Sequence, residues 1–343
     1  MRHALLPLGL ILAACGTGAT GPDEPPDDAV PTRALSEPGA WTYLGFAGGQ
    51  YAGGAAMPEP HRAAGLIRAR AVAPLDGNGL PNPSGRIVLL SIGMSNTTQE
   101  FCNPNASGQC GAQTFVAQAL ADASVQRASL VMVDGARGGQ SAATWLTPAA
   151  PNYDQVRDTR LAPAGVTEAQ VQIVWLKVAN PGPTASLPAS TSDAYQLVTQ
   201  IGSIARALRV RYPNLRLLFL SSRTYGGYAT TSLNPEPYAY ESGFAVKWVI
   251  AAQISRMAGG PADPRAGDLS YDAAAPWMGW GPDLWANGTT PRADGLLWNR
   301  DDFGNDGTHP SASGVQKVGR LLLDFFKASG LARCWFLIGG QCS

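Results

Sequence analysis

The chain has 343 residues, and its 25 Lys and Arg balance 25 Asp and Glu, so the formal net charge at pH 7 is zero. A flat charge balance argues against nucleic-acid binding and against electrostatic docking on an anionic membrane. The length is sufficient for a full hydrophobic core, which excludes a small domain that depends on disulfide or metal staples. With 45% hydrophobic and 15% charged residues, the composition is typical of a globular protein.

The first residues resemble a bacterial export signal. A cationic start is followed by an apolar run over residues 4–14, which ends in Leu12-Ala13-Ala14-Cys15. Such a run is too short to cross a bilayer, which takes about 20 apolar residues, and it has the length of a signal-peptide core. The ending resembles a lipobox, in which the Cys is lipidated and becomes the mature N-terminus. We expect residues 1–14 to be a signal peptide and Cys15 to carry the lipid. An ordinary signal peptide with a chance Cys is the alternative.

This reading predicts an exported lipoprotein, in the periplasm or at the cell surface, that touches the membrane only through its lipid anchor. Residues 16–21 read Gly-Thr-Gly-Ala-Thr-Gly and fit a dinucleotide-binding pattern. We reject that function, because no strand of the mature chain precedes them and a Pro- and Asp-rich stretch follows where a helix is needed. Residues 15–40 are therefore predicted to be a lipidated tether, and Trp41 begins sequence that looks folded.

An irregular N-terminal segment is predicted over residues 41–85, which are rich in Gly and Pro and show little periodicity. Short apolar runs then predict buried parallel strands over residues 86–92, 129–133, 170–178 and 215–221. Helical spacing and capping residues predict helices over 112–127, 193–212 and 238–258, and a last helix that Pro310-Ser311 opens.

Residues 259–305 show no period and are expected to form a long loop region. Strands that alternate with helices predict an α/β fold, here a three-layer α/β/α sandwich with a parallel sheet of about five strands. We assign residues 86–343 to this one domain.

Four Cys remain besides Cys15, in two pairs that each bracket a short loop. Cys102 and Cys110 are predicted to form one disulfide, and Cys334 and Cys342 the other, as export would permit. Each bridge is expected to contribute roughly 2–3 kcal/mol by the loop-entropy model. Zinc binding is the weaker alternative, because the chain has no Cys-x-x-Cys and no His near these positions.

One histidine stands out. The chain has 3 His; His3 lies in the signal segment and His61 in the irregular segment, whereas His309 follows Asp306 by three residues, just before the last helix. In a serine hydrolase, a neutral imidazole takes the proton of the Ser, and a carboxylate on its other nitrogen fixes the tautomer. His309 is therefore the candidate base and Asp306 its candidate partner. A plain surface turn is the alternative.

Other polar or glycine residues follow the predicted strands, at the sheet edge where parallel folds bind their ligands. The first strand runs into Ser95 and Asn96, the second is followed by Gly138-Gly139, and the third by Asn180. Ser95 as a helix cap, the glycines as turn residues and Asn180 as a turn residue before Pro181 are the structural alternatives.

The order Ser, Gly, Asn, His resembles the four blocks of the SGNH (GDSL-like) hydrolase family over about residues 86–329. The resemblance implies a flavodoxin-like SGNH fold with Ser95 as nucleophile, His309 as base and Asp306 as its orienting partner. It also implies an oxyanion hole formed by the backbone N–H groups of Ser95 and Gly139 and by the side-chain amide of Asn180. No cofactor and no metal are implied.

The first block, Gly-x-Ser-Asn, and the Gly-Gly followed by Trp145 look most like acetylxylan esterases and sialate O-acetylesterases. The sequence also departs from the family. Met94 replaces the usual Asp of the first block, and Asn96 replaces the residue that follows the Ser in classical members. Val178 and Pro181 replace the usual Gly and Asp of the third block.

Gly138 is the alternative to Gly139 as the second backbone donor of the oxyanion hole. The departures keep a second function open: a catalytically degenerate glycan-binding or structural cell-envelope lipoprotein. The first expectation is an esterase that removes acyl groups, foremost acetyl, from an extracytoplasmic carbohydrate, with a small-molecule or polysaccharide ester as substrate and no nucleic-acid partner.

Two further clusters precede His309. Four tryptophans are expected in the core by default, or else along the cleft where they could stack on sugar rings: Trp277, Trp280, Trp285 and Trp298. Asp301, Asp302, Asn305 and Asp306 resemble a Ca²⁺ loop, but the spacing fails because Gly304 stands where a ligand is needed after Asp302, so no metal is expected.

Overall fold

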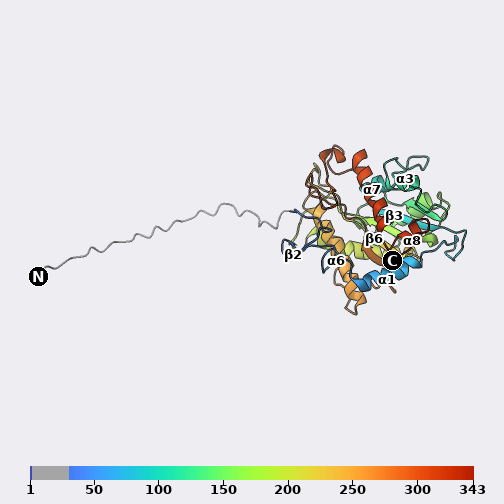
Figure 1. The fold of residues 1–343 in the computed structure, drawn as a ribbon, viewed down its shortest axis with the longest axis horizontal. Coiled ribbons are helices and arrows are strands. Elements are labelled where there is room, and N and C mark those ends of the chain that lie inside the picture. Colours follow the sequence, from blue (N-terminus) through green and yellow to red (C-terminus); the bar gives the residue numbers. More distant parts are fainter. Residues whose placement is uncertain (2–30) are drawn as a thin grey trace.

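A computed structural model describes residue 1 and residues 31–343, so the expected signal peptide, Cys15 and most of the tether lie outside the described residues. The centre of the described part is a five-stranded sheet of order β4-β3-β5-β6-β7 (Figure 1). All neighbouring strands pair in parallel. The strands are β3 (Ile87–Gly93), β4 (Leu130–Asp134), β5 (Val171–Lys177), β6 (Leu217–Leu220) and β7 (Trp277–Trp280). The predicted fold class is confirmed.

Helices cover both faces of this sheet, because the strands are apolar on both sides. Val88 and Leu90 of β3 belong to one core cluster, and Ile87 and Leu89 to the other. Side chains of α4 (Pro151–Val156), α5 (Asp193–Arg211) and α6 (Tyr238–Met257) fill the first cluster. The second is filled by α1 (Glu59–Arg70), α2 (Ser95–Phe101), α3 (Phe115–Ala121), α7 (Ala312–Ala328) and α8 (Arg333–Phe336). Figure 1 shows α7 beside α3 in this layer. The result is a three-layer sandwich.

The strand order places a crevice at the carboxyl end of β3. The chain first pairs β4 with β3 on one side, then adds β5 on the other side of β3, and β6 and β7 continue outward. Helices before and after this reversal lie on opposite faces, so the loops that follow β3 and β5 diverge and leave space between them. The loop from β3 into α2 carries Ser95.

Two regions predicted to be irregular contain regular structure. Residues 41–85 hold the short hairpin strands β1 (Thr42–Tyr43) and β2 (Phe46–Ala47) as well as α1. A Cβ on Gly65 of α1 would come within 2.8 Å of the Trp277 ring, so a glycine lies on the packed face of the helix beside the buried Leu66 and Ala69. Strand β7 lies within 259–305; its four buried residues, Trp-Met-Gly-Trp, are too few to show a period.

The folded domain also begins before Trp41. Ala34 and Leu35 are buried. The hydroxyl of Tyr240 donates to the Arg33 carbonyl at 2.9 Å, and the Ser36 N–H donates to the carboxylate of Asp283 at 3.0 Å. The predicted tether boundary at residue 40 is therefore too late, because two small apolar residues in a polar stretch give no sequence signal.

The other elements match the predictions, with bounds that are shorter or, for β3 and β4, shifted by one residue. The predicted helix over 112–127 is the shorter α3, which starts after a turn closed by a Thr114 N–H to Gly111 carbonyl bond of 3.0 Å. Both predicted disulfides are confirmed, with Cα–Cα distances of 4.5 Å for Cys102–Cys110 and 4.9 Å for Cys334–Cys342. Within the described residues, no helix has the length and apolar character that a bilayer crossing demands.

Candidate active site

Ser95 stands at the point where β3 ends and α2 begins. Gly93 makes this turn possible: its φ is +154°, and a Cβ there would lie 2.1 Å from the Lys177 carbonyl oxygen. No other residue could bring β3 so close to the end of β5. The turn leaves Ser95 as the first residue of α2, at the carboxyl edge of the sheet.

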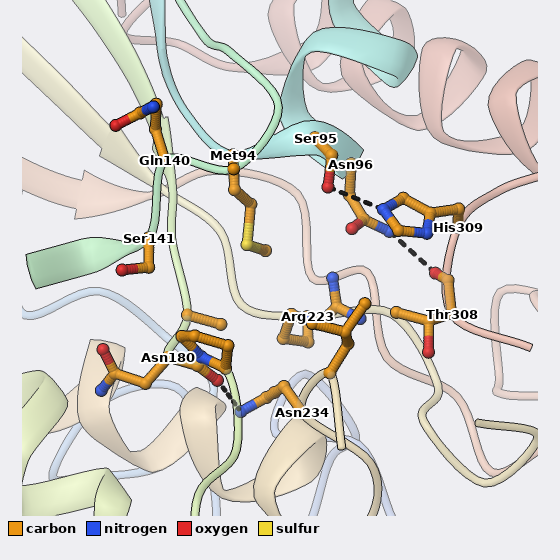
Figure 2. A pocket seen from close by; sticks show the side chains of 14 residues that line it. Met94, Ser95, Asn96, Gln140, Ser141, Asn180, Arg223, Asn234, Thr308 and His309 are labelled. Carbon is orange, nitrogen blue, oxygen red and sulfur yellow. Dashed lines mark hydrogen bonds between the residues drawn. The ribbon is translucent and has the colours of Figure 1, made fainter. Parts of the chain in front are cut away.

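Three side chains from two distant parts of the sequence meet at this edge. The Ser95 Oγ lies 2.8 Å from His309 Nε2 (Figure 2), and His309 Nδ1 lies 2.5 Å from Asp306 Oδ2. One oxygen of the Asp306 carboxylate thus fixes the ring, so that Nε2 faces the Ser hydroxyl. This is the arrangement in which an imidazole accepts a proton from Ser.

The loop that carries His309 is held from both sides. The side-chain amide of Asn96 donates to the Thr308 carbonyl at 2.8 Å, which ties the loop to α2. Gly307 has a φ of +65°, and a Cβ there would lie 1.7 Å from the Tyr228 carbonyl oxygen. The loop therefore needs glycine at this position to reach Ser95.

Hydrogen bonds keep the Asp306 carboxylate ionised. Burial raises the pKa of Asp306, but the His309 ring and the backbone N–H groups of Thr308 and His309 donate to its carboxylate and bring the pKa below the ordinary value. The two backbone bonds are each 3.0 Å long. Asp306 is therefore an acceptor that can hold the ring over a wide pH range.

Two backbone N–H groups at the pocket are candidate donors to an oxyanion. Among the described residues, no acceptor lies within hydrogen-bond distance of the N–H groups of Ser95 and Gly139. Gly139 lines the pocket at Ser95 and has a φ of +77°. Gly138 does not line it, although a Cβ there would come within 4.0 Å of the Ser95 Cβ. The geometry favours Gly139 over Gly138 as the second donor.

Asn180 departs from its predicted role. Its Nδ2 donates to Asp193 Oδ1 at 2.9 Å and to Gln200 Oε1 at 2.8 Å, and Figure 2 shows the amide turned away from Ser95. An amide NH₂ has two hydrogens, and both are taken here. The side chain therefore has no donor left for an oxyanion, and the third member of the predicted oxyanion hole is corrected.

The pocket at Ser95 encloses about 440 Å³ including its open mouth. Besides the predicted residues, its walls contain Met94, which the sequence analysis noted only as a departure from the family. They also contain Gln140, Asn234 and Arg223, which it missed. Arg223 follows β6 in Ser221-Ser222-Arg223, so the strand-end rule that singled out Ser95 would also have found it.

A buried ion pair supports the floor of the site. Lys177 at the end of β5 donates to Glu100 of α2 at 2.5 Å, and both side chains are fully buried. Burial lowers the pKa of Lys177 to about 8 and raises the pKa of Glu100, although each charge favours the other. The pair links the strand that precedes Asn180 to the helix that begins with Ser95.

The tryptophans are core residues. Trp277, Trp280, Trp285 and Trp298 are all at most 5% exposed, and none of them lines the pocket at Ser95. Their indole N–H groups donate to protein acceptors, among them the Gln50 carbonyl and the Glu236 carboxylate. The default expectation is confirmed, and these rings are not placed to stack on a sugar in this pocket.

Comparisons with known proteins give distant structural matches. No family model matches the chain, and no curated protein matches it. Among solved structures, it is similar to a carbohydrate esterase family 2 enzyme with a carbohydrate binding domain from Myceliophthora fergusii, at 14% identity over 72% of this chain and 67% of that one, with a TM-score of 0.37.

Two further solved structures are similar at comparable distance. An SGNH hydrolase from Slackia heliotrinireducens is 18% identical over 70% of this chain and 99% of that one, with a TM-score of 0.32. An extracellular lipase from Streptomyces rimosus is 12% identical over 69% of this chain and 97% of that one, with a TM-score of 0.33.

Proposed function

We propose that the protein is a serine esterase that removes O-acetyl groups from an extracytoplasmic carbohydrate. The observation that carries this proposal is the continuous chain of hydrogen bonds from Ser95 through His309 to Asp306, at 2.8 and 2.5 Å, inside a pocket at the carboxyl edge of a parallel sheet.

In the proposed reaction, the Ser95 oxygen attacks the ester carbonyl carbon while its proton moves to His309 Nε2. Negative charge develops on the carbonyl oxygen, and the N–H groups of Ser95 and Gly139 donate to it. The tetrahedral intermediate then releases the sugar hydroxyl, which takes the proton from His309, and leaves an acyl group on Ser95. Water, deprotonated by His309, attacks this acyl-enzyme and frees the carboxylic acid.

The dimensions of the pocket support a short acyl group. The space inside it that a water-sized molecule can occupy is about 90 Å³, well below the about 300–1,000 Å³ of ordinary ligand pockets. Met94 lies on its wall beside the reactive Ser95, and an acetyl group needs no longer channel. The lipobox-like ending at Cys15 supports export and lipid anchoring, which we include in the proposal.

Turnover of 4-nitrophenyl acetate by the wild-type protein and by Ser95→Ala tests the chemistry. We expect the wild-type protein to release nitrophenol and the variant to lose this activity. Acetate release from O-acetylated polysaccharides then tests the substrate class. A wild-type protein that binds such polysaccharides but hydrolyses neither ester would favour the glycan-binding alternative, which the engaged amide of Asn180 keeps open.

A further inference from the structure

Arg223 is a buried cation without a partner. It is 2% exposed, and its Nε is completely buried with no hydrogen-bond acceptor. Among residues 31–343, no acceptor or carboxylate lies within hydrogen-bond or ion-pair distance of its guanidinium group. Buried guanidinium groups are almost always paired, because an isolated charge loses its hydration without compensation.

The carboxylates that act on Arg223 from a distance are Glu100, Glu236 and Asp306. Each has its own donors. Glu100 is bonded to Lys177, and Asp306 to His309.

The Glu236 carboxylate also has hydrogen-bond donors of its own. Its carboxylate accepts hydrogen bonds from the Gly226 N–H at 2.9 Å, the Tyr240 N–H at 2.9 Å and the indole N–H of Trp285 at 2.7 Å. All three donors are neutral, so Glu236 offsets the charge of Arg223 only at a distance. The guanidinium therefore keeps its hydrogen-bonding capacity for something that enters the pocket.

The position of Arg223 points to the substrate. The residue lines the same pocket as Ser95 and His309, and Figure 2 shows its side chain in the middle of the labelled pocket residues. A second unmatched polar atom, the buried Oδ1 of Asn234, belongs to the same wall. Of the two, the guanidinium group is the charged one, and its planar fork suits a carboxylate.

We propose that Arg223 binds a carboxylate of the substrate, so that the enzyme selects esters with a carboxylate near the scissile bond. A planar guanidinium group binds a carboxylate through two parallel hydrogen bonds, and such pairs are strong where water is excluded. The inference rests on the proposed esterase function. If the acyl group is acetyl, as proposed, the carboxylate belongs to the alcohol, for example a sugar acid. A carboxylate on the acyl side would mean that the enzyme removes the half-ester of a dicarboxylic acid instead of acetyl.

Two pairs of esters separate these sources in assays of the full chain. For the acyl side, 4-nitrophenyl hemisuccinate is compared with 4-nitrophenyl levulinate, in which a methyl ketone replaces the carboxylate at nearly the same size. For the alcohol side, O-acetylated glucuronic acid is compared with its methyl ester. We expect kcat/KM of the wild-type protein to favour the acid at least tenfold in one pair.

The variant Arg223→Met keeps the length of the side chain and removes its charge. We expect its ratio of kcat/KM, acid over neutral ester, to fall to about 1, and Arg223→Lys to retain part of the preference. The matched control is Arg320→Met, because Arg320 is exposed on α7 and bonded only to Asp324. It should leave the ratio unchanged. Thermal unfolding is a second readout: loss of an unpaired buried charge should not lower the Tm of Arg223→Met.

A ratio near 1 in both wild-type pairs would overturn the inference. So would an equal loss of kcat/KM on the acid and neutral esters in Arg223→Met, because that result would place Arg223 at the reacting carbonyl. Ser95-dependent turnover of 4-nitrophenyl acetate tests the esterase function separately. If that turnover is absent, the role of Arg223 is tested by the binding of O-acetylated glucuronic acid and of its methyl ester to Ser95→Ala. Tighter binding of the acid that Arg223→Met abolishes supports the inference, and equal binding refutes it.

Discussion

The ring of His309 has both nitrogens engaged, one by a carboxylate and one by a hydroxyl group. Asp306 orients the ring from three residues away on the same loop, whereas Ser95 reaches it from a different element of the fold. Each of these side chains depends on the other two for its function, because a proton leaves Ser95 only if the imidazole is present and correctly oriented.

We therefore predict that Ser95→Ala and His309→Ala each lower kcat by about 10⁴ or more, and that the double variant loses little beyond either single variant. Steady-state kinetics with 4-nitrophenyl acetate measures all three. Ser84→Ala, at an exposed position before the start of β3 and so at the opposite end of that strand from Ser95, is a control for the effect of substitution itself. Losses that multiply in the double variant would mean that the two residues do not act in one step.

Asn180 is predicted to matter for stability more than for rate. Its amide donates to the buried side chains of Asp193 and Gln200, so Asn180→Ala leaves two buried acceptors unmatched at a cost of roughly 1–3 kcal/mol. We expect kcat to fall less than tenfold, compared with the ~10²–10³ that removal of an oxyanion donor costs. Urea unfolding and kinetics on the same sample separate the two effects. A rate loss above a hundredfold with unchanged stability would return Asn180 to the oxyanion hole.

Between elements, the Lys177–Glu100 pair joins the end of β5 to α2, directly below the turn that presents Ser95. A buried pair is costly to break, because removal of one partner leaves an uncompensated charge. Replacement of both by apolar residues is often neutral or stabilising.

We predict that Glu100→Leu and Lys177→Met each destabilise the protein by roughly 3–5 kcal/mol, and that the double variant regains most of this loss. Chemical denaturation of the four proteins gives the coupling free energy. If the two single losses simply add, the pair is not the unit that holds α2 against β5. The activity of the double variant also tests whether the Ser95 turn needs the charges or only the packing.

Elements with a strong apolar period were predictable from the sequence, and those held by tertiary contacts were not. Strand β3 and helix α7 have long runs or clear apolar faces, so the predictions for them agree with the structure. Strand β7 and helix α1 depend on each other: Trp277 lies against Gly65, and its indole N–H donates to the His61 carbonyl at 3.0 Å. Neither segment carries this contact in its local pattern.

The features of the site also fall into those that the sequence predicts and those that depend on tertiary contacts. The strand-end rule and the short Asp306–His309 spacing single out residues whose role depends on their place in the chain. The direction of the Asn180 amide and the isolation of Arg223 depend on what surrounds them in three dimensions. A sequence shows which residues reach the sheet edge, but the hydrogen bonds that occupy them depend on distant elements such as α5.

Across the whole molecule, several buried ionisable groups tie stability to pH. Burial raises the pKa of Asp134 to about 6 and that of Glu241 to about 7, whereas burial lowers the pKa of His61. The two carboxyl groups make the folded state less stable as pH rises through their titration, and His61 has the opposite effect below its ordinary pKa. The pH dependence of the wild-type protein's stability is therefore the sum of these contributions. A variant that removes one titratable group isolates the contribution of that group.

Asp134 is the group for which the direction of the pH effect on stability can be tested most directly. In the unfolded chain its pKa is close to 3.8, and in the folded protein it is about 6. Between these values the folded state holds a proton that the unfolded state has lost, so this group's contribution to stability decreases as pH rises. A pKa difference of about 2 corresponds to roughly 3 kcal/mol at most.

Asp134→Asn removes the titration and keeps the shape of the network. The hydroxyl groups of Ser91 and Thr98 lie 2.6 Å from the two carboxylate oxygens, and both hydroxyls can rotate to suit an amide. We predict that the free energy of unfolding of the wild-type protein, relative to Asp134→Asn, falls by roughly 2–3 kcal/mol between pH 4 and pH 7, as measured by urea denaturation. Contributions from Glu241 and His61 cancel in this difference. A constant difference would mean that Asp134 stays ionised throughout, with the two hydroxyl groups and the Ala136 N–H compensating fully for its burial.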